Sequence, residues 1–285
     1  MRKLLYFPVV LALMAFLATP SLAGEKCTAV YGKGPNKLRL ATGSPGALGL
    51  VKALADKFNS THNTSICWQK AGSGASLKLL KNKKVDLVMV HAPAAEKKAV
   101  KEGWATKRTL IGSNEFYIVG PKNDPAKIAA AKSAADAYQR IAKSKSKFFS
   151  RGDNSGTNKK ELMIWKMAGI TPKGGWYIVT KDFMTPTLKR ANREKGYFMT
   201  DSSTWVVNKK KMGNLKVLFR GDPILINTYH AMCAPAGATP GQKWASEFVD
   251  FVGSKEGQRI VANYGKKQYG EPLYNDAAYA KKYEH

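Results

Sequence analysis

The stretch Lys37-Leu38-Arg39-Leu40-Ala41-Thr42-Gly43-Ser44-Pro45-Gly46 predicts a strand that ends in a glycine-rich turn. A helix is expected directly after this turn, because Leu50, Leu54 and Phe58 recur at the spacing of one helical face. The same order returns twice, with strands and then helices at 65–69 and 77–80, and at 85–90 and 96–102. Strands that alternate with helices indicate an α/β fold with mixed, mostly parallel sheets.

The chain after residue 118 predicts a second lobe with the same alternation. A long helix rich in alanine and lysine is expected near 125–143, and a strand is expected at 147–151. The helix after that strand is expected to bury Leu162, Trp165 and Met167.

Strands at 215–219 and 226–231 are expected to return the chain to the first lobe. Two crossings between lobes would form a hinge, and a cleft between hinged lobes is a common ligand trap. The predicted organisation is a first lobe of residues 24–117 and 221–285 and a second lobe of residues 118–220.

The first 23 residues have the features of a secretory signal peptide. Arg2 and Lys3 precede an apolar run at 4–17, and small residues follow up to Ala23. A membrane anchor is the alternative, but the run is shorter than the ~20 residues that a spanning helix needs. We therefore expect cleavage after Ala23 and export to the periplasm.

Three cysteines, Cys27, Cys67 and Cys233, follow the signal segment. An exported protein can hold a disulfide, and an odd number leaves at least one cysteine unpaired within the chain. Cys27 and Cys67 both flank early strands and form a plausible pair, whereas Cys233 lies in an apolar stretch and is expected to be a buried thiol. Neither the cysteines nor the four histidines have the spacing of a zinc motif, so no metal site is expected.

The chain is strongly basic, with 47 Lys and Arg against 20 Asp and Glu and a net charge of +27. A nucleic-acid-binding protein would also be basic, but no aromatic–basic motif, helix-turn-helix pattern or low-complexity tail accompanies this charge. Two interpretations remain: a solvated cationic surface, or long-range steering of a small anion.

The segment Ser150-Arg151-Gly152-Asp153-Asn154-Ser155-Gly156-Thr157 lies at a predicted strand-to-helix turn and suits a small oxyanion. Arg151 offers a rigid fork of donors, and Ser155 and Thr157 offer hydroxyl groups. The start of the helix adds unpaired backbone N–H groups and the positive end of the helix dipole. No base or nucleophile accompanies them, which favours binding over catalysis and predicts no catalytic residue and no cofactor.

Two further turns, around Thr42 and Ser44 and around Ser73, are also rich in donors and poor in acids. Because ligands of open α/β sheets bind at the carboxyl ends of strands, we expect all three turns to meet at one anion pocket. The predicted ligand-binding set is Thr42, Ser44, Ser73, Arg151, Ser155, Gly156 and Thr157.

Each of these residues also has a structural interpretation. Arg151 could pair with Asp153, which we expect to orient it or to cap the helix. Ser44 and Ser73 could be helix N-caps, and Thr42 could face the core. His91 is expected to be a hydrogen-bonded scaffold residue near the hinge.

The chain resembles the tungstate-binding proteins of the TupA type, the solute-binding components of tungstate ABC importers. Segments that carry the resemblance span nearly all of the sequence after residue 23: 40–44, 72–74, 86–97, 149–161 and 256–258. The resemblance implies a two-lobed, type II-like periplasmic binding protein fold. It also implies that Thr42, Ser44, Ser73, Arg151, Ser155 and Thr157 line an oxyanion site, and that a membrane permease and an ATPase are partners.

The predicted function is therefore an exported receptor that captures tungstate, or molybdate, as a monomer. A phosphate receptor of the same fold is the first alternative, because the Arg151 segment also resembles that of phosphate-binding proteins, in which an Asp such as Asp153 can accept the proton of the ligand. A basic protein that binds polyanions or nucleic acid is the second. An exported hydrolase would need a Ser-His-Asp set, paired carboxylates or a metal cluster, and the sequence shows no convincing one.

Overall fold

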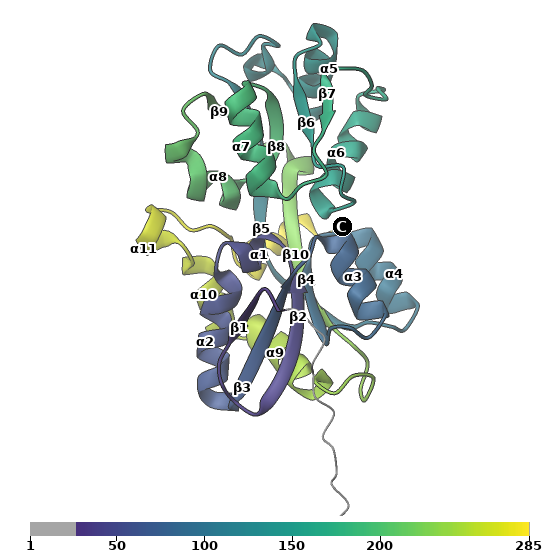
Figure 1. The fold of residues 1–285 in the computed structure, drawn as a ribbon, viewed down its shortest axis with the longest axis vertical. Helices are drawn as coiled ribbons and strands as arrows, with labels where there is room; N and C mark the ends of the chain where they lie inside the picture. The colour runs from purple at the N-terminus through teal and green to yellow at the C-terminus, as the bar shows by residue number, and fades with distance from the viewer. Residues whose placement is uncertain (1–26, 285) are drawn as a thin grey trace, which may run out of the picture.

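The computed structural model describes residues 27–284. The predicted signal peptide and its cleavage site after Ala23 lie outside the described residues. Two α/β lobes are stacked along the long axis of the molecule, and strands β5 and β10 run between them (Figure 1). No helix among residues 27–284 combines the length and the apolar character needed to cross a bilayer.

The first lobe has a mixed sheet with parallel pairings of β2 with β3 and with β4. β1 and β10 join this sheet in antiparallel pairings. Its strands are β1 (Ala29–Tyr31), β2 (Asn36–Thr42), β3 (Thr64–Lys70), β4 (Leu87–Val90), the first part of β5 (Thr106–Pro121) and β10 (Ile226–Cys233). Its helices are α1 (Ser44–Ala47), α2 (Leu50–His62), α3 (Ser73–Lys81), α4 (Pro93–Lys101), α9 (Gln242–Gly253), α10 (Lys255–Asn263), α11 (Lys266–Tyr269), α12 (Ala277–Ala280) and the 3₁₀ turn η4 (Lys281–Tyr283).

The second lobe repeats this arrangement, with β6 parallel to β7 and to β8. The second part of β5 pairs with β8 and β9 in antiparallel fashion. Its own strands are β6 (Phe148–Ser150), β7 (Tyr177–Val179), β8 (Tyr197–Asp201) and β9 (Leu215–Phe219). Its helical segments are η1 (Ile128–Ala130), α5 (Ala134–Ser144), α6 (Gly156–Met167), α7 (Met184–Glu194), α8 (Ser202–Asn208), η2 (Lys209–Lys211) and η3 (Pro223–Leu225).

Each lobe has its own hydrophobic core. In the first lobe, α2 buries Leu54 and Phe58 against the sheet, as its apolar spacing predicts. In the second lobe, Phe148 of β6 packs against Tyr138 of α5 and Trp165 of α6. These packed aromatic rings fix the position of the β6–α6 connection, which carries the Arg151 segment.

One strand crosses between the lobes directly, because the 16 residues of β5 extend through both sheets. The return crossing leads through η3 into β10, which pairs with β5 from Ile226 onward. The sheets are therefore mixed and α/β, as predicted. The predicted return by residues 215–219 is wrong, since Leu215 and Leu218 of β9 belong to the second core.

Two other expectations in the second lobe also need correction. The helix expected at 125–143 is split into η1 and α5, because Ser133 caps α5 by accepting a hydrogen bond from the N–H of Asp136. Trp165 is buried as predicted, but Leu162 and Met167 are 49% and 55% exposed. Ile164 takes the inward position on α6 instead.

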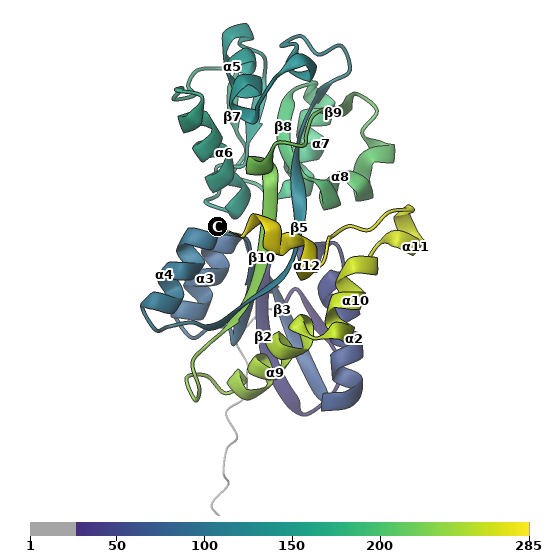
Figure 2. The ribbon, with the colours of Figure 1, turned by 180° about the vertical axis from the view of Figure 1, so that it is seen from behind.

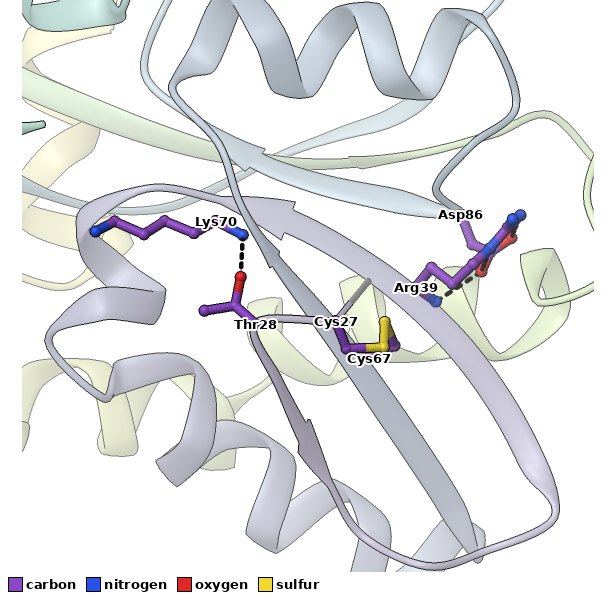
Figure 3. The surroundings of a disulfide bond; sticks show 6 residues. All are labelled: Cys27, Thr28, Arg39, Cys67, Lys70 and Asp86. Carbon is purple, nitrogen blue, oxygen red and sulfur yellow. Dashed lines mark hydrogen bonds and ion pairs between the residues drawn. A yellow bond between two sulfur atoms is a disulfide. The ribbon is translucent and has the colours of Figure 1, made fainter. Parts of the chain in front are cut away.

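The cysteine predictions are confirmed. Cys27 and Cys67 form a disulfide with a Cα–Cα distance of 5.4 Å, which ties the start of the described chain to β3 (Figure 3). Cys233 is a buried free thiol on β10. Ser254 caps α10, because its Oγ accepts a hydrogen bond from the N–H of Gly257.

Candidate functional site

A small cavity of about 40 Å³ lies between the two lobes. The N-terminal ends of α1 and α3 reach it from the first lobe, and those of α6 and α7 from the second. The first-turn N–H groups of a helix have no acceptor within that helix, and they carry the positive end of its dipole. The cavity is lined by Thr42, Gly43, Ser44, Pro45, Ala47, Leu48, Lys70, Gly72, Ser73, His91, Arg151, Ser155, Phe183, Met184, Thr185, Pro186 and Thr204.

Three features make this cavity a candidate anion site. Each helix follows a strand, so the cavity lies at the carboxyl ends of strands, where α/β proteins bind ligands. Its lining is rich in hydroxyl and backbone donors and contains no carboxylate. One buried water needs roughly 10–15 Å³ by this measure, so the cavity admits only a small ligand.

Arg151 supplies the cationic fork of the site. It follows β6 and its side chain is only 5% exposed. Its Nε donates to the carbonyl oxygen of Asp182 at 3.2 Å, and its Nη2 donates to Asp153. Asp153 also accepts from the N–H of Ser155, so it both orients Arg151 and braces the start of α6, as expected for a structural acid.

The backbone of this loop needs unusual conformations. Gly152 has φ +59°, and a Cβ at this position would lie 2.2 Å from Cγ1 of Val179. Asn154 also adopts a left-handed conformation, and its N–H donates to Oδ1 of Asn158. The glycine is therefore required for the loop to turn Arg151 toward the cavity.

The predicted hydroxyl groups of the first lobe line the cavity and form hydrogen bonds with different partners. Thr42 is buried, and its hydroxyl donates to the carbonyl oxygen of Met89 at 2.7 Å. Ser73 Oγ accepts from the N–H of His91. Neither Ser44 nor Ser73 is an N-cap, because Gly43 and Gly72 hold those positions.

Five of the seven predicted ligand-binding residues meet at the cavity: Thr42, Ser44, Ser73, Arg151 and Ser155. Ser155 caps α6, since its Oγ accepts from the N–H of Asn158. Gly156 and Thr157 lie next to the cavity lining. Among residues 27–284, the Oγ1 of Thr157 is buried without a hydrogen-bond partner, and its role as a ligand stays a prediction.

A buried polar chain runs beneath the cavity and links the lobes. His91 Nδ1 donates to Oδ1 of Asn227 at 2.8 Å, and Asn227 Nδ2 donates to Oδ1 of Asn114 at 2.8 Å. Asn114 then donates to Asp201, which also accepts from the hydroxyl of Ser44. The expectation that His91 is a hydrogen-bonded scaffold residue is confirmed.

Burial shifts the pKa at both ends of this chain. It lowers the pKa of His91 from 6.5 to about 4, although the hydrogen bond with Asn227 opposes the shift. It also raises the pKa of Asp201, and the hydrogen bonds from Thr204 and Ser44 partly counteract this shift. His91 is therefore neutral at physiological pH.

Sequence reasoning missed the α7 side of the cavity and Lys70. Phe183, Met184 and Thr185 contribute the start of a fourth helix. The sequence signal was present, because Pro186 stands in the first turn of α7, where proline commonly marks a helix start. No group of three or more His, Cys, Asp or Glu side chains in the described part of the chain could hold a metal ion.

Glu161 lies behind the Arg151 loop as a buried carboxyl. It accepts hydrogen bonds from the hydroxyls of Ser150 and Tyr177 and from the indole N–H of Trp165. Burial raises its pKa from 4.5 to about 7, and these donors only partly counteract the shift. Through Ser150 it supports the end of the strand that leads to Arg151.

The Glu161 carboxyl predicts a pH dependence of stability. Its folded pKa is raised, so its contribution to the free energy of unfolding is fully present below about pH 4.5 and is lost as the pH rises through about 7. The loss is on the order of 3 kcal/mol at 1.36 kcal/mol per pKa unit. We expect Glu161→Gln to abolish this loss, so that the variant gains stability relative to the parent between about pH 5 and pH 8.

Urea unfolding of both proteins across this pH range checks the prediction. The comparison isolates Glu161, because His91 contributes with the opposite sign in both proteins: its folded pKa is lowered, so stability rises with pH between about 4 and 6.5. Parallel curves for the two proteins would contradict the assignment.

Comparison with known proteins places the chain in a family. A family model described as a PBP superfamily domain matches residues 29–256. The tungstate-binding protein TupA of Peptoclostridium acidaminophilum is 32% identical over 243 residues, which are 83% of this chain and 84% of that protein. The chain therefore belongs to the PBP superfamily and, within it, to the family that includes the TupA proteins.

Two further similarities agree with this family. A putative ABC transporter anion-binding protein of Haloferax volcanii is 35% identical over 223 residues. These residues are 76% of this chain and 65% of that protein. The crystal structure of the tungstate ABC transporter from Geobacter sulfurreducens aligns with a TM-score of 0.73 and 37% identity, over 81% of this chain and all of that chain.

Proposed function

We propose that this protein is an exported receptor that captures tungstate between its lobes and delivers it to an ABC permease and its ATPase. The observation that carries the proposal is the small interlobe cavity, which is lined by donors and by no carboxylate. The names of the similar proteins support tungstate as the ligand and an ABC transporter as the setting.

The chemistry of the cavity favours a fully deprotonated dianion. Phosphate is partly protonated at neutral pH, and its proton needs an acceptor. Asp153 was the candidate acceptor, but its carboxylate is bound to Arg151 and to the N–H of Ser155 and does not line the cavity. Tungstate carries no proton under these conditions and needs only donors. The helix N-termini supply them, together with the hydroxyls of Ser73 and Ser155, which accept in the hydrogen bonds described above and keep their own hydrogens.

The remaining parts of the proposal follow from the sequence. A signal peptide cleaved after Ala23 would deliver the protein to the periplasm. We propose that it acts as a monomer without a cofactor, that molybdate can occupy the same cavity, and that nucleic acid is not a partner. With no acid–base pair lining the cavity, the site binds the anion without transforming it.

Calorimetric titration with tungstate, molybdate, phosphate and sulfate tests the proposal. We expect tight one-to-one binding of tungstate and no heat from phosphate or sulfate. Tungstate affinity should stay flat between about pH 6 and pH 8, because His91 is neutral across that range. The Glu161→Gln variant serves as a control in which the nearby buried carboxyl cannot titrate. Heat from phosphate alone would make the protein a phosphate receptor.

A further inference from the structure

Lys70 brings a second cationic side chain to the cavity. It is the last residue of β3, and its backbone N–H donates to Oγ1 of Thr28 at 2.9 Å (Figure 3). This bond fixes the end of the strand just before the glycine turn that starts α3. The side chain extends from this fixed point and lines the cavity.

The partner of Lys70 is an aromatic ring from the other lobe. Its Nζ lies 4.3 Å from the centroid of the Phe183 ring, which is a cation–π distance. Phe183 is the N-cap residue of α7 and also lines the cavity. The guanidinium carbon of Arg151 lies 5.8 Å from the same centroid, so one ring is close to both cations.

The charges around the cavity explain why Lys70 matters. Arg151 forms an ion pair with Asp153, so much of its charge is already compensated. Lys70 forms no ion pair with any carboxylate of residues 27–284, and its contact is a neutral ring. Lys70 therefore offers a dianion a cationic charge that no carboxylate of the described chain neutralises. Asp201 does not line the cavity and is bound to the hydroxyl of Thr204, which does.

We propose that Lys70 is a second cationic group of the oxyanion site, held in place by Phe183 when the lobes are together. Since Lys70 belongs to the first lobe and Phe183 to the second, opening the lobes would separate them. The full positive charge of the site is then assembled only in the closed state. The inference rests on the proposed function for the class of ligand, an oxyanion.

The test is tungstate titration of the ligand-free protein and of Lys70→Met, with Lys78→Met as the matched control. Lys78 is an exposed lysine of α3 that does not line the cavity. Lys70→Met should lower the affinity by about fivefold to tenfold, mainly through faster dissociation, and Lys70→Arg should restore most of it. Lys78→Met should bind like the parent protein.

The role of the ring is tested by a double-mutant cycle with Phe183→Leu. Because the ring acts by holding Lys70, the loss in the double variant should be smaller than the product of the two single losses. Thermal unfolding of ligand-free Lys70→Met and Lys70→Arg should match the parent, since Lys70 is exposed. Two results would overturn this inference but not the proposed function: parent-like tungstate affinity of Lys70→Met, or a loss in the double variant equal to the product of the two single losses. A parent protein that binds none of the four oxyanions would overturn the proposed function as well.

Discussion

Replacing Arg151 with alanine is expected to lower tungstate affinity by about a hundredfold to a thousandfold. Removing one member of a buried charged contact typically costs 3–5 kcal/mol, because the remaining charges lose their partner. Here the loss has two parts: the donors for the anion disappear, and Asp153 keeps a negative charge close to the dianion. Calorimetric titration measures the affinity, and urea unfolding of the ligand-free protein measures the fold.

Two further variants separate these parts. Arg151→Lys keeps the charge but loses the planar fork, so an intermediate affinity is expected. Arg151→Ala combined with Asp153→Asn removes the stranded carboxylate, and it should recover part of the lost affinity. If Arg151→Ala destabilised the ligand-free protein strongly while tungstate still bound normally, Arg151 would be a structural residue paired with Asp153, and its assignment to the site would be wrong.

Much of the first lobe was predictable because its signals are local. The strand at 37–42, its glycine turn and the apolar face of α2 all follow from spacing within about twenty residues. The start of α10 carries a local signal of the same kind, because Ser254 stands at its N-cap and Glu256 in its first turn. The pairing of Cys27 with Cys67 needed only the order of the early strands.

The second lobe shows where local reasoning fails. An apolar residue near the right spacing looks buried in the sequence, yet Leu162 and Met167 lie on the solvent side of α6. The sheet that pairs β9 with β5 is also set by tertiary packing, which placed residues 215–219 in the second core. Neither outcome has a signal within a short window of sequence.

The candidate site also has parts that the sequence predicts and parts that it does not. The strand-to-helix turns that hold Ser73 and Arg151 were visible, because glycine and donors at strand ends follow a general rule. The contact between Lys70 and Phe183 was not visible, because the two residues lie 113 positions apart and belong to different lobes. Only the folded arrangement, in which the two lobes face each other (Figure 2), shows which turns touch.

The lobes meet at these turns without room for a side chain. A Cβ at Gly74 of α3 would lie 2.8 Å from the carbonyl oxygen of Asn154 in the opposite lobe. A Cβ at Gly156 of α6 would lie 2.7 Å from the carbonyl oxygen of His91 and 2.5 Å from its ring. Neither glycine has a positive φ, so alanine suits the backbone at both positions. The glycines are required by the contact between lobes rather than by the local chain.

Gly156→Ala should therefore weaken tungstate binding while leaving the separate lobes intact. The added methyl group must displace a backbone oxygen in the closed state, and overpacking of this kind costs typically 1–3 kcal/mol, or about fivefold to a hundredfold in affinity. The three atoms nearest to this methyl group all belong to His91 of the other lobe, so opening the lobes relieves the clash, and alanine suits a helix better than glycine. Titration should show the weaker binding, and urea unfolding of the ligand-free variant should show no loss of stability.

Gly175→Ala is the matched control, because a Cβ there has no neighbour within 4 Å and the residue has no positive φ. It should bind tungstate like the parent protein. Gly74→Ala should behave like Gly156→Ala, since it meets the other lobe at a different point of the same contact. If Gly74→Ala and Gly156→Ala bound tungstate as well as Gly175→Ala and the parent protein do, the turns would not touch in the ligand-bound protein. The tungstate site would then have to form with the lobes further apart. A loss confined to Gly74→Ala and Gly156→Ala would instead mean that the anion is held by closing the lobes, because the atoms nearest to both added methyl groups belong to the opposite lobe.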